Sequence, residues 1–268
     1  MNMKIVILTS TSLRHKYIAS MVAKEATVEL IVTEKKSHKI EGTNLYDEET
    51  KNFIDKHFND RLKSETIFFR EFEEFPINTP IIEVDHNEIN GLLVFEKILK
   101  VNPYIILLFG TSIIKNPLLD TFKSKIVNLH LGLSPYYKGS ATNLFPICFK
   151  ELECIGATIH LATEKVDDGS VLCQLRPEVK LEDTIHDIGN KVILESGKVL
   201  PAVLKLLTDK SLELTKQSGI GRVCRIKDLT PKVMREIYSN FNNDFKKEYI
   251  LKANLKQIQK PIVEIKLK

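Results

Sequence analysis

The chain has 268 residues, of which 43% are hydrophobic and 28% are charged. This composition is ordinary for a soluble globular protein and excludes collagen-like, disordered and disulfide-scaffold classes. No run approaches the ~20 apolar residues that cross a bilayer, and MNMKIVILTS lacks the long apolar stretch and cleavage site of a signal peptide. We therefore expect a cytoplasmic protein without membrane insertion, with one large core and a smaller appendage.

The net charge is +4, from 39 basic and 35 acidic residues, and the positive excess lies in the C-terminal part. Residues 205–268 carry 15 basic and 7 acidic side chains. Such a segment suits RNA, an anionic lipid or a diphosphate-bearing ligand. Its lysines are scattered, and we expect no set of exposed aromatic residues interleaved with them to stack on bases, which favours a solvated surface over a nucleic-acid partner.

Cysteine and glycine spacing argues against several common sites. Cys148, Cys154, Cys173 and Cys224 form no C-x-x-C pair, so we expect free thiols and no metal. The first predicted strand–helix turn, LTSTSLRH, has no glycine, so the dinucleotide-binding fingerprint is absent. The phosphate-loop motif of NTPases is absent as well.

Short apolar runs alternate with amphipathic segments along most of the chain. The apolar runs predict strands at 4–9, 28–34, 81–85, 104–110, 126–132, 157–163 and 171–175. The amphipathic segments predict helices at about 10–23, 46–75, 92–100 and 185–207. This alternation is typical of an α/β fold, so we expect a Rossmann-like, mostly parallel sheet with helices on both faces.

The pattern changes after Leu207. LELTK, an SGIG turn and RVCRIK predict a hairpin. Thr230 and Pro231 predict a helix with threonine as its N-cap and proline at its first position, and PIVEIKLK predicts an edge strand. We therefore expect a main domain over 1–207 and a small, β-rich extension over 208–268.

Polar side chains suited to acyl transfer lie on the strand at 126–132. Asn128 and His130 are two residues apart, so both project from one face near the carboxyl end of the strand. A later VDDG turn supplies Asp167 and Asp168. An amide and an imidazolium can stabilise an oxyanion, while a carboxylate sets the histidine's pKa and helps to deprotonate an amine. A core histidine and a common turn sequence would leave the same pattern, so spacing alone keeps both interpretations open.

Two linked motifs, NLHLGLSPYYKG and GATIHLATEKVDDGSVLCQ, resemble the formyltransferases that use 10-formyltetrahydrofolate. The family pattern is Asn-x-His, a proline-containing loop, Gly-x-Thr with a following histidine in some members, and Asp-x-Gly. The resemblance covers residues 100–207 and, by strand order, the N-terminal half. It implies formyl transfer from 10-formyltetrahydrofolate to an amine, without a metal.

The resemblance implies roles for individual residues. Asn128, His130 and Asp167 match the catalytic residues of the family, while Asp168 falls on a position that the family varies. Asn128 and a protonated His130 would hold the oxyanion, and Asp167 would tune His130 and relay protons. His160 would be a supporting or core residue. ILLFGTSIIKNP resembles the pterin-binding segment, so the expected cofactor-binding residues are Phe109, Gly110, Ser112, Ile114 and Val166.

The extension bears on which amine accepts the formyl group. Methionyl-tRNA formyltransferases carry a longer C-terminal barrel, and glycinamide ribonucleotide transformylases end soon after the core. Sugar N-formyltransferases resemble the chain better, with a short β-rich extension that often forms a dimer and a segment similar to 51–69. The resemblance implies a nucleoside-diphosphate-linked amino sugar, such as a 4-amino-4,6-dideoxyhexose for surface polysaccharide synthesis, and a homodimer.

A nucleotide-linked acceptor requires cations and donors for two phosphates. Arg14 and His15 open the helix at 10–23, and a helix N-terminus favours anions. Arg61, Tyr137 and Lys138 are the other expected substrate-binding residues, with a solvated surface position as the alternative for each charge.

Two other functions stay open. The basic extension also suits methionyl-tRNA formyltransferase, whose activity on tRNA would fall steeply with salt. The second alternative is a folate- or nucleotide-binding module that has lost its chemistry.

Overall fold

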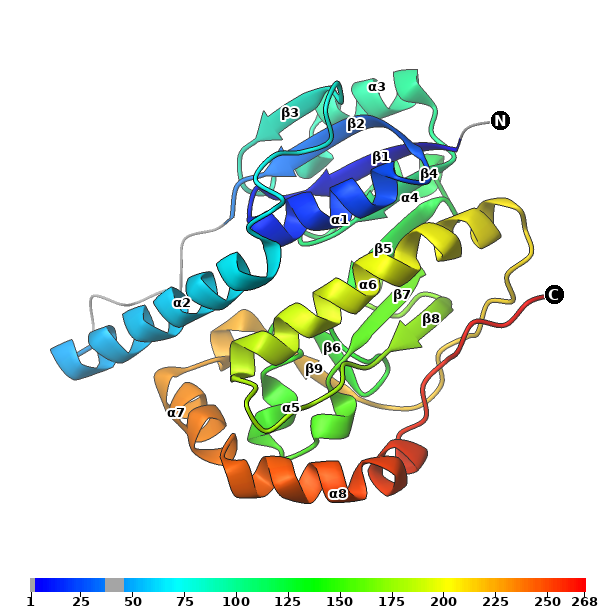
Figure 1. The fold of residues 1–268 in the computed structure, drawn as a ribbon. Helices are drawn as coiled ribbons and strands as arrows, with labels where there is room; N and C mark the ends of the chain where they lie inside the picture. Colours follow the sequence, from blue (N-terminus) through cyan, green and yellow to red (C-terminus); the bar gives the residue numbers. More distant parts are fainter. Residues whose placement is uncertain (1–2, 37–45) are drawn as a thin grey trace.

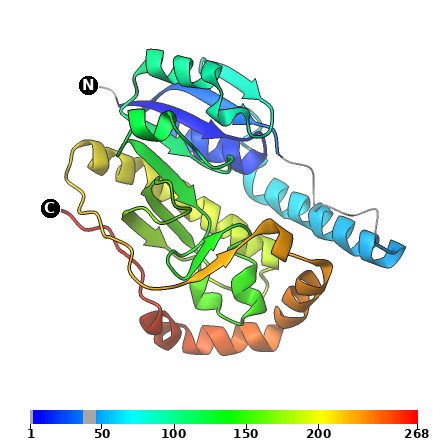
Figure 2. The ribbon, with the colours of Figure 1, turned by 180° about the vertical axis from the view of Figure 1, so that it is seen from behind.

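A seven-stranded sheet forms the centre of the computed structural model, which describes residues 3–36 and 46–268 (Figure 1, Figure 2). The strand order is β3-β2-β1-β4-β5-β7-β8. The strands from β3 to β5 are parallel, whereas β7 and β8 are antiparallel to their neighbours. The predicted strands are confirmed to within two residues: β1 (Lys4–Thr9), β2 (Thr27–Glu34), β3 (Ile81–Val84), β4 (Ile105–Leu108), β5 (Ile126–His130), β7 (Ala157–Leu161) and β8 (Val171–Leu175).

Helices cover both faces of this sheet, which confirms the predicted α/β architecture. On one face, α1 (Leu13–Ala23) and α6 (Ile185–Thr208) pack together, and α2 (Glu48–Phe69) contacts both. The opposite face is covered by α3 (Leu92–Val101) and the short α4 (Leu118–Thr121). The remaining short helices of the main domain are η2 (Glu88–Asn90), α5 (Phe145–Cys148) and η3 (Leu152–Cys154).

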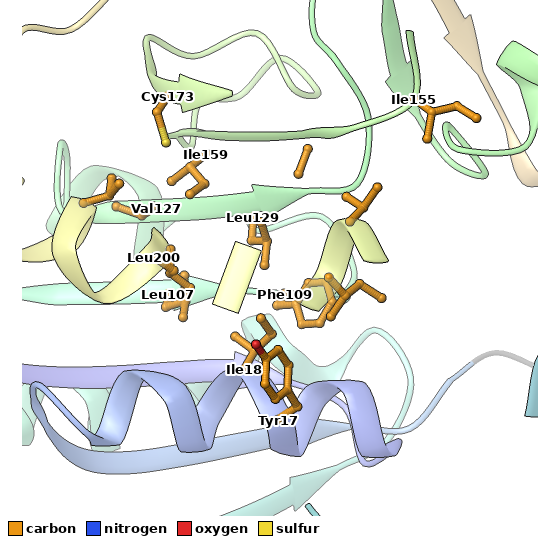
Figure 3. Packing of buried hydrophobic residues seen from close by; sticks show 14 of the residues in the cluster. Tyr17, Ile18, Leu107, Phe109, Val127, Leu129, Ile155, Ile159, Cys173 and Leu200 are labelled. Carbon is orange, nitrogen blue, oxygen red and sulfur yellow. The ribbon is translucent and has the colours of Figure 1, made fainter. Parts of the chain in front are cut away.

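The side chains of each inner strand divide between two hydrophobic cores. In β1, Ile5 and Ile7 belong to the core under α1 and α6, whereas Val6 and Leu8 belong to the core under α3. This follows from the alternation of side chains along a strand. Figure 3 shows the first core, where side chains of α1 and α6 meet those of β4, β5 and β7. The two cores fix the parallel strands, so the carboxyl ends of β1, β4 and β5 share one edge.

The segment after α6 packs against the main sheet and its loops. β9 (Arg222–Cys224) pairs in parallel with β6 (Tyr137–Gly139). The predicted hairpin of LELTK with RVCRIK is therefore wrong, because Thr215 of LELTK makes an isolated antiparallel bridge with Val171 of β8. The open edge of β8 offers unpaired backbone groups, and these compete successfully with a local hairpin partner.

The extension holds more helix than strand, which corrects the expected β-rich extension: it contains α7 (Pro231–Asn240), α8 (Asn243–Gln259) and the short η4 (Ile226–Asp228), against the three residues of β9. The predicted start of α7 is confirmed, because the Thr230 side chain accepts a hydrogen bond from Val233 N and Pro231 takes the first position. The last segment, PIVEIKLK, makes one isolated bridge, between Leu267 and Leu212, in place of a full edge strand. Within the two described ranges, no helix is both long and apolar enough to cross a membrane.

Candidate active site

The candidate site lies where the sheet changes from parallel to antiparallel pairing. Asn128 and His130 share one face of β5, and the antiparallel register places His160 of β7 directly opposite Asn128. Asp167 comes from the loop between β7 and β8. Two strands and one loop thus contribute four polar side chains to a single place.

The carboxylate of Asp167 is the centre of this cluster. Its Oδ1 accepts a hydrogen bond from Asn128 Nδ2 at 3.1 Å and lies 3.4 Å from His160 Nε2. Its Oδ2 accepts a hydrogen bond from Gly139 N at 2.8 Å and lies 3.3 Å from His130 Nδ1. The structure therefore brings Asn128, His130 and Asp167 into contact, as the sequence predicted.

The second carboxylate of the VDDG turn points elsewhere. The Asp168 side chain is 39% exposed and forms an ion pair with Lys138, whereas the Asp167 side chain is only 8% exposed. Gln217 of the extension donates from Nε2 to the carbonyl oxygens of Asp167 at 2.9 Å and of Gly169 at 2.8 Å. The extension thereby holds the turn that aims Asp167 at the two histidines.

Burial and neighbouring charges shift the pKa values of His130 and Asp167. Burial lowers the pKa of His130 below its usual range, and the opposing effect of the Asp167 charge only partly offsets this. Burial by itself raises the pKa of Asp167. The charge of His130 and the hydrogen bond with His160 lower this pKa by more than burial raises it, so the net shift is downward. The lowered pKa of His130 favours a neutral ring, and the lowered pKa of Asp167 favours an ionised carboxylate.

The neutral His130 has a defined orientation. Its Nε2 lies 3.1 Å from the carbonyl oxygen of Tyr137, which can only accept a hydrogen bond. Its Nδ1 faces a second acceptor, Asp167 Oδ2 at 3.3 Å, so the single proton of a neutral ring can satisfy only one of the two contacts. A proton that reaches Asp167 can be shared with Nδ1 without any movement of the ring.

A cavity of about 560 Å³ includes this cluster in its wall. At one part of the cavity, all five residues expected to bind the cofactor line the wall: Phe109, Gly110, Ser112, Ile114 and Val166. Ser112 N donates to Glu34 Oε2 at 2.6 Å, which fixes the loop after β4 to the end of β2. Within the described residues, Ser112 Oγ is buried and has no hydrogen-bond partner. This part of the wall therefore has a polar group available for a ligand.

Basic and imidazole side chains also line this cavity. Arg14 of α1 and Arg61 of α2 reach this wall, as the sequence predicted, and Lys36 joins them from the end of β2. Arg14 forms an ion pair with the buried Glu65. Across residues 3–36 and 46–268, neither Arg61 nor Lys36 forms an ion pair, and Lys36 Nζ donates a hydrogen bond to the carbonyl oxygen of Gly110. Arg61 therefore carries a positive charge that no described carboxylate pairs with.

His15 does not line this cavity, so its expected substrate contact is corrected. Helix α1 turns by about 100° per residue, which brings His15 to its buried face while Arg14 faces the cavity. His15 Nδ1 lies 2.9 Å from Thr9 Oγ1, and the ring centre lies 4.7 Å from that of Phe109. His15 thus supports the end of β4 from behind.

Tyr137 and Lys138 also lie outside the cavity wall. Tyr137 is 1% exposed and donates its hydroxyl proton to Glu151, so only its backbone carbonyl serves the site, through His130. Lys138 is engaged with Asp168. Gly139 of β6 lines the cavity, whereas the side chains of Tyr137 and Lys138 are held outside it by Glu151 and Asp168.

Several polar residues of the cavity were missed or undervalued in the sequence. His160 directly touches Asp167, and its position follows from the register of β5 with β7, which the sequence does not show. Lys36 could have been found, because it follows the strand at 28–34 just as the polar residues follow other strands. His57 of α2 and His186 of α6 lie far apart in the chain and have no local signal.

Within the described residues, no three His, Cys, Asp or Glu side chains are grouped as metal ligands.

Comparisons with curated proteins connect this site to known relatives. The human trifunctional purine biosynthetic protein adenosine-3 is 28% identical over 116 residues, which are 43% of this chain and 11% of that protein. The methionyl-tRNA formyltransferase of Bacillus mycoides is 31% identical over 126 residues, which are 46% of this chain and 40% of that protein. The match thus spans less than half the length of either relative.

A solved structure and a family profile cover more of the chain. The sugar N-formyltransferase from a Shewanella species shares the fold, with a TM-score of 0.56 at 16% identity over 84% of this chain and 78% of that one. Residues 3–204 match the profile of a family described as formyl transferase. That range includes Asn128, His130 and Asp167, and it covers three quarters of the sequence. The chain therefore belongs to the formyl transferase family.

Proposed function

We propose that this protein transfers a formyl group from 10-formyltetrahydrofolate to the amine of a nucleoside-diphosphate-linked amino sugar, for surface polysaccharide synthesis. The observation that supports it most is the single cavity in which the Asn128–His130–Asp167 cluster, an unpartnered hydroxyl and a group of cations all lie. The division into a catalytic domain over 1–207 and an extension over 208–268, and a homodimer, are parts of the same proposal.

The loop after β4 fits the formyl donor. Phe109, Ile114 and Val166 offer apolar surface, and the buried Ser112 Oγ offers a hydrogen bond that no described residue satisfies. A pterin ring has apolar faces and a polar edge, which suits this combination. When bound there, the donor supplies the formyl group.

The cluster is suited to the charge and proton changes of the transfer. As the amine nitrogen bonds to the formyl carbon, the formyl oxygen gains negative charge and the amine must lose a proton. Asn128 Nδ2, which donates to Asp167 Oδ1 and lies 3.2 Å from His160 Nε2 in this structure, would turn one N–H to that oxygen, and the ionised Asp167 is a base for that proton. His130 Nδ1, 3.3 Å from Asp167, shares the proton until the departing nitrogen takes it.

The cations that line the cavity support a phosphate-bearing acceptor. Arg14, Lys36 and Arg61 come from three different elements and line one wall. A diphosphate carries enough negative charge to occupy several cations, and guanidinium groups bind its oxygens in a fork. Such an acceptor would place its amine toward Asp167 and its nucleoside toward α2 and α6.

An acceptor assay tests this proposal. The purified protein and 10-formyltetrahydrofolate are incubated with a panel of amino-sugar nucleotides, charged initiator tRNA, glycinamide ribonucleotide or no acceptor. We expect release of tetrahydrofolate with one sugar nucleotide. Turnover with tRNA alone would favour the alternative that the Bacillus mycoides relative represents, and turnover without any acceptor would indicate hydrolysis.

The pH dependence of kcat/KM should reflect the neutral resting state of His130. Because the pKa of His130 is lowered by burial, the neutral ring persists through pH 6.5, where an ordinary histidine is half protonated. The lowered pKa of Asp167 keeps its carboxylate ionised in the same range. We therefore expect the acid-side fall of kcat/KM to have its midpoint below pH 6.5. Initial rates with a checked donor concentration at each pH measure this, and a midpoint at or above pH 6.5 would contradict the assigned state.

A further inference from the structure

Two histidines of the cavity wall share one tyrosine hydroxyl from the C-terminal extension. His57 Nδ1 lies 3.1 Å from Tyr238 Oη, and His186 Nε2 lies 3.2 Å from the same atom. The two imidazole rings are 4.8 Å apart between centroids and nearly perpendicular. His57 and His186 line the cavity that contains Asp167, whereas Tyr238 stands behind them. Three helices, α2, α6 and α7, therefore meet at this hydroxyl.

Both histidines are neutral at physiological pH. Burial, followed by the neighbouring charges, lowers the pKa of each ring to about 4. His57 is 4% exposed and His186 is 8% exposed, which agrees with the dominant effect of burial. Each ring therefore carries one proton, on either of its two nitrogens.

The shared hydroxyl couples the positions of these two protons. Tyr238 has one proton to donate, so it donates to one histidine and accepts from the other. If it donates to His57 Nδ1, then His57 is protonated at Nε2 and His186 at Nε2. If it donates to His186 Nε2, then both rings are protonated at Nδ1. In either case, one outer nitrogen is a hydrogen-bond donor and the other is an acceptor.

The outer nitrogens are His57 Nε2 and His186 Nδ1. Within residues 3–36 and 46–268, neither atom makes a hydrogen bond, and neither is a buried atom without a partner. They thus remain accessible, on rings that line the same cavity as the cations Arg14 and Arg61. Ile226 and Leu229 of the extension line this cavity as well.

We propose that Tyr238 is a positioning residue whose hydroxyl holds His57 and His186 as a matched donor and acceptor for an amide-type edge, N–H beside C=O, of the acceptor substrate. This inference rests on the proposed nucleotide-sugar function and specifies how its acceptor is recognised. A uracil or thymine base carries such an edge, because its ring N–H lies beside a ring carbonyl, whereas the N–H and C=O of a trans acetamido group point in opposite directions. A single hydroxyl in the extension thereby links the C-terminal segment to acceptor binding.

The tautomers of the two histidines provide the first test. Long-range ¹H–¹⁵N spectra of the wild-type protein at pH 7 distinguish Nδ1–H from Nε2–H rings. We expect His57 and His186 to carry the same tautomer, and we expect Tyr238→Phe to remove this correlation. Opposite tautomers in the wild-type protein would overturn the proposal. A hydroxyl that merely filled space would not impose this relation.

Ligand binding provides the second test and identifies the source of the amide edge. Calorimetric titrations compare wild-type and Tyr238→Phe proteins with uridine diphosphate, UDP-glucose and UDP-N-acetylglucosamine. Recognition of the base predicts a loss of about 5- to 10-fold for all three ligands, the effect of one neutral hydrogen bond. A loss for UDP-N-acetylglucosamine alone would overturn the proposal, because the three ligands share the base and only this one adds an acetamido group. A change below twofold for every ligand, or no binding to the wild-type protein, would overturn the proposal.

Tyr249→Phe is the matched control. Tyr249 lies on α8 in the same extension, and its hydroxyl accepts a hydrogen bond from Gln257 within that helix. Tyr249 does not line the cavity, and the hydroxyl between His57 and His186 is that of Tyr238. Binding of the three nucleotides should therefore be unchanged in Tyr249→Phe. An equal loss in Tyr238→Phe and Tyr249→Phe would assign the effect to folding of the extension. Because none of the three ligands has a free amine, the result is independent of whether formyl transfer occurs.

Discussion

Asp167→Asn is expected to lower kcat by about 100- to 10,000-fold, the usual contribution of a positioned acid–base group. The asparagine keeps the shape of the side chain but removes the negative charge that takes up the amine proton. It also removes the charge that raises the pKa of His130, so the histidine becomes a still poorer proton carrier. Stopped-flow or quench measurements of formyl transfer at saturating substrates measure the chemical step. Donor binding should persist, because the loop after β4 is untouched.

Asp168→Asn is the control for this experiment. The two residues are adjacent, but Asp168 is exposed and pairs only with Lys138 at the surface of the loop. Loss of an exposed ion pair changes stability by at most about 1 kcal/mol, and we expect kcat within about twofold of wild type. If Asp168→Asn abolished transfer and Asp167→Asn did not, the assignment of the base would be reversed.

Gly139→Ala is expected to impair both folding and transfer. Gly139 has a φ of +97°, and a Cβ atom added there would lie 2.1 Å from the carbonyl oxygen of Cys224 in β9. The left-handed conformation alone costs a non-glycine residue about 1–2 kcal/mol, and β6 must also move away from β9. We expect the melting temperature to fall by roughly 4–8 °C. Because Gly139 N donates to Asp167 Oδ2, kcat should fall by an order of magnitude or more as well.

A second glycine provides the comparison for stability. Gly189 lies inside α6, and an added Cβ would meet no atom within 4 Å. Gly189→Ala should therefore raise the free energy of unfolding by about 0.5–1 kcal/mol through better helix propensity. Differential scanning calorimetry of both variants gives the two shifts. A Gly139→Ala protein as stable as wild type would show that β6 and β9 are not held as closely as described.

The amino-acid sequence by itself determined the strands of the sheet and the placement of two polar residues of the candidate site. Local hydrophobic patterns are short-range, and each strand from 4–9 to 171–175 carries its own, so the strands could be predicted to within two residues. Asn128 and His130 could be placed together because two residues on one strand share a face. The pairing with Asp167 came from the resemblance between two linked motifs, since no local rule joins a strand to a distant turn.

Tertiary structure alone decided which polar residues surround the cavity and which do not. His15, Tyr137 and Lys138 looked suited to substrate, but helix phase and strand alternation bury them or turn them toward other partners. His160 joins Asp167 through strand register, a long-range property that the sequence pattern does not encode.

The backbone pairing of the C-terminal segment likewise depended on partners that are distant in the sequence. RVC pairs with β6 and Thr215 with the free edge of β8, because these exposed backbone groups outcompete a local hairpin. The meeting of His57, His186 and Tyr238 depends on three helices packed from separate parts of the chain. Contacts of this kind are set by packing of the whole fold, so only the tertiary structure could reveal them.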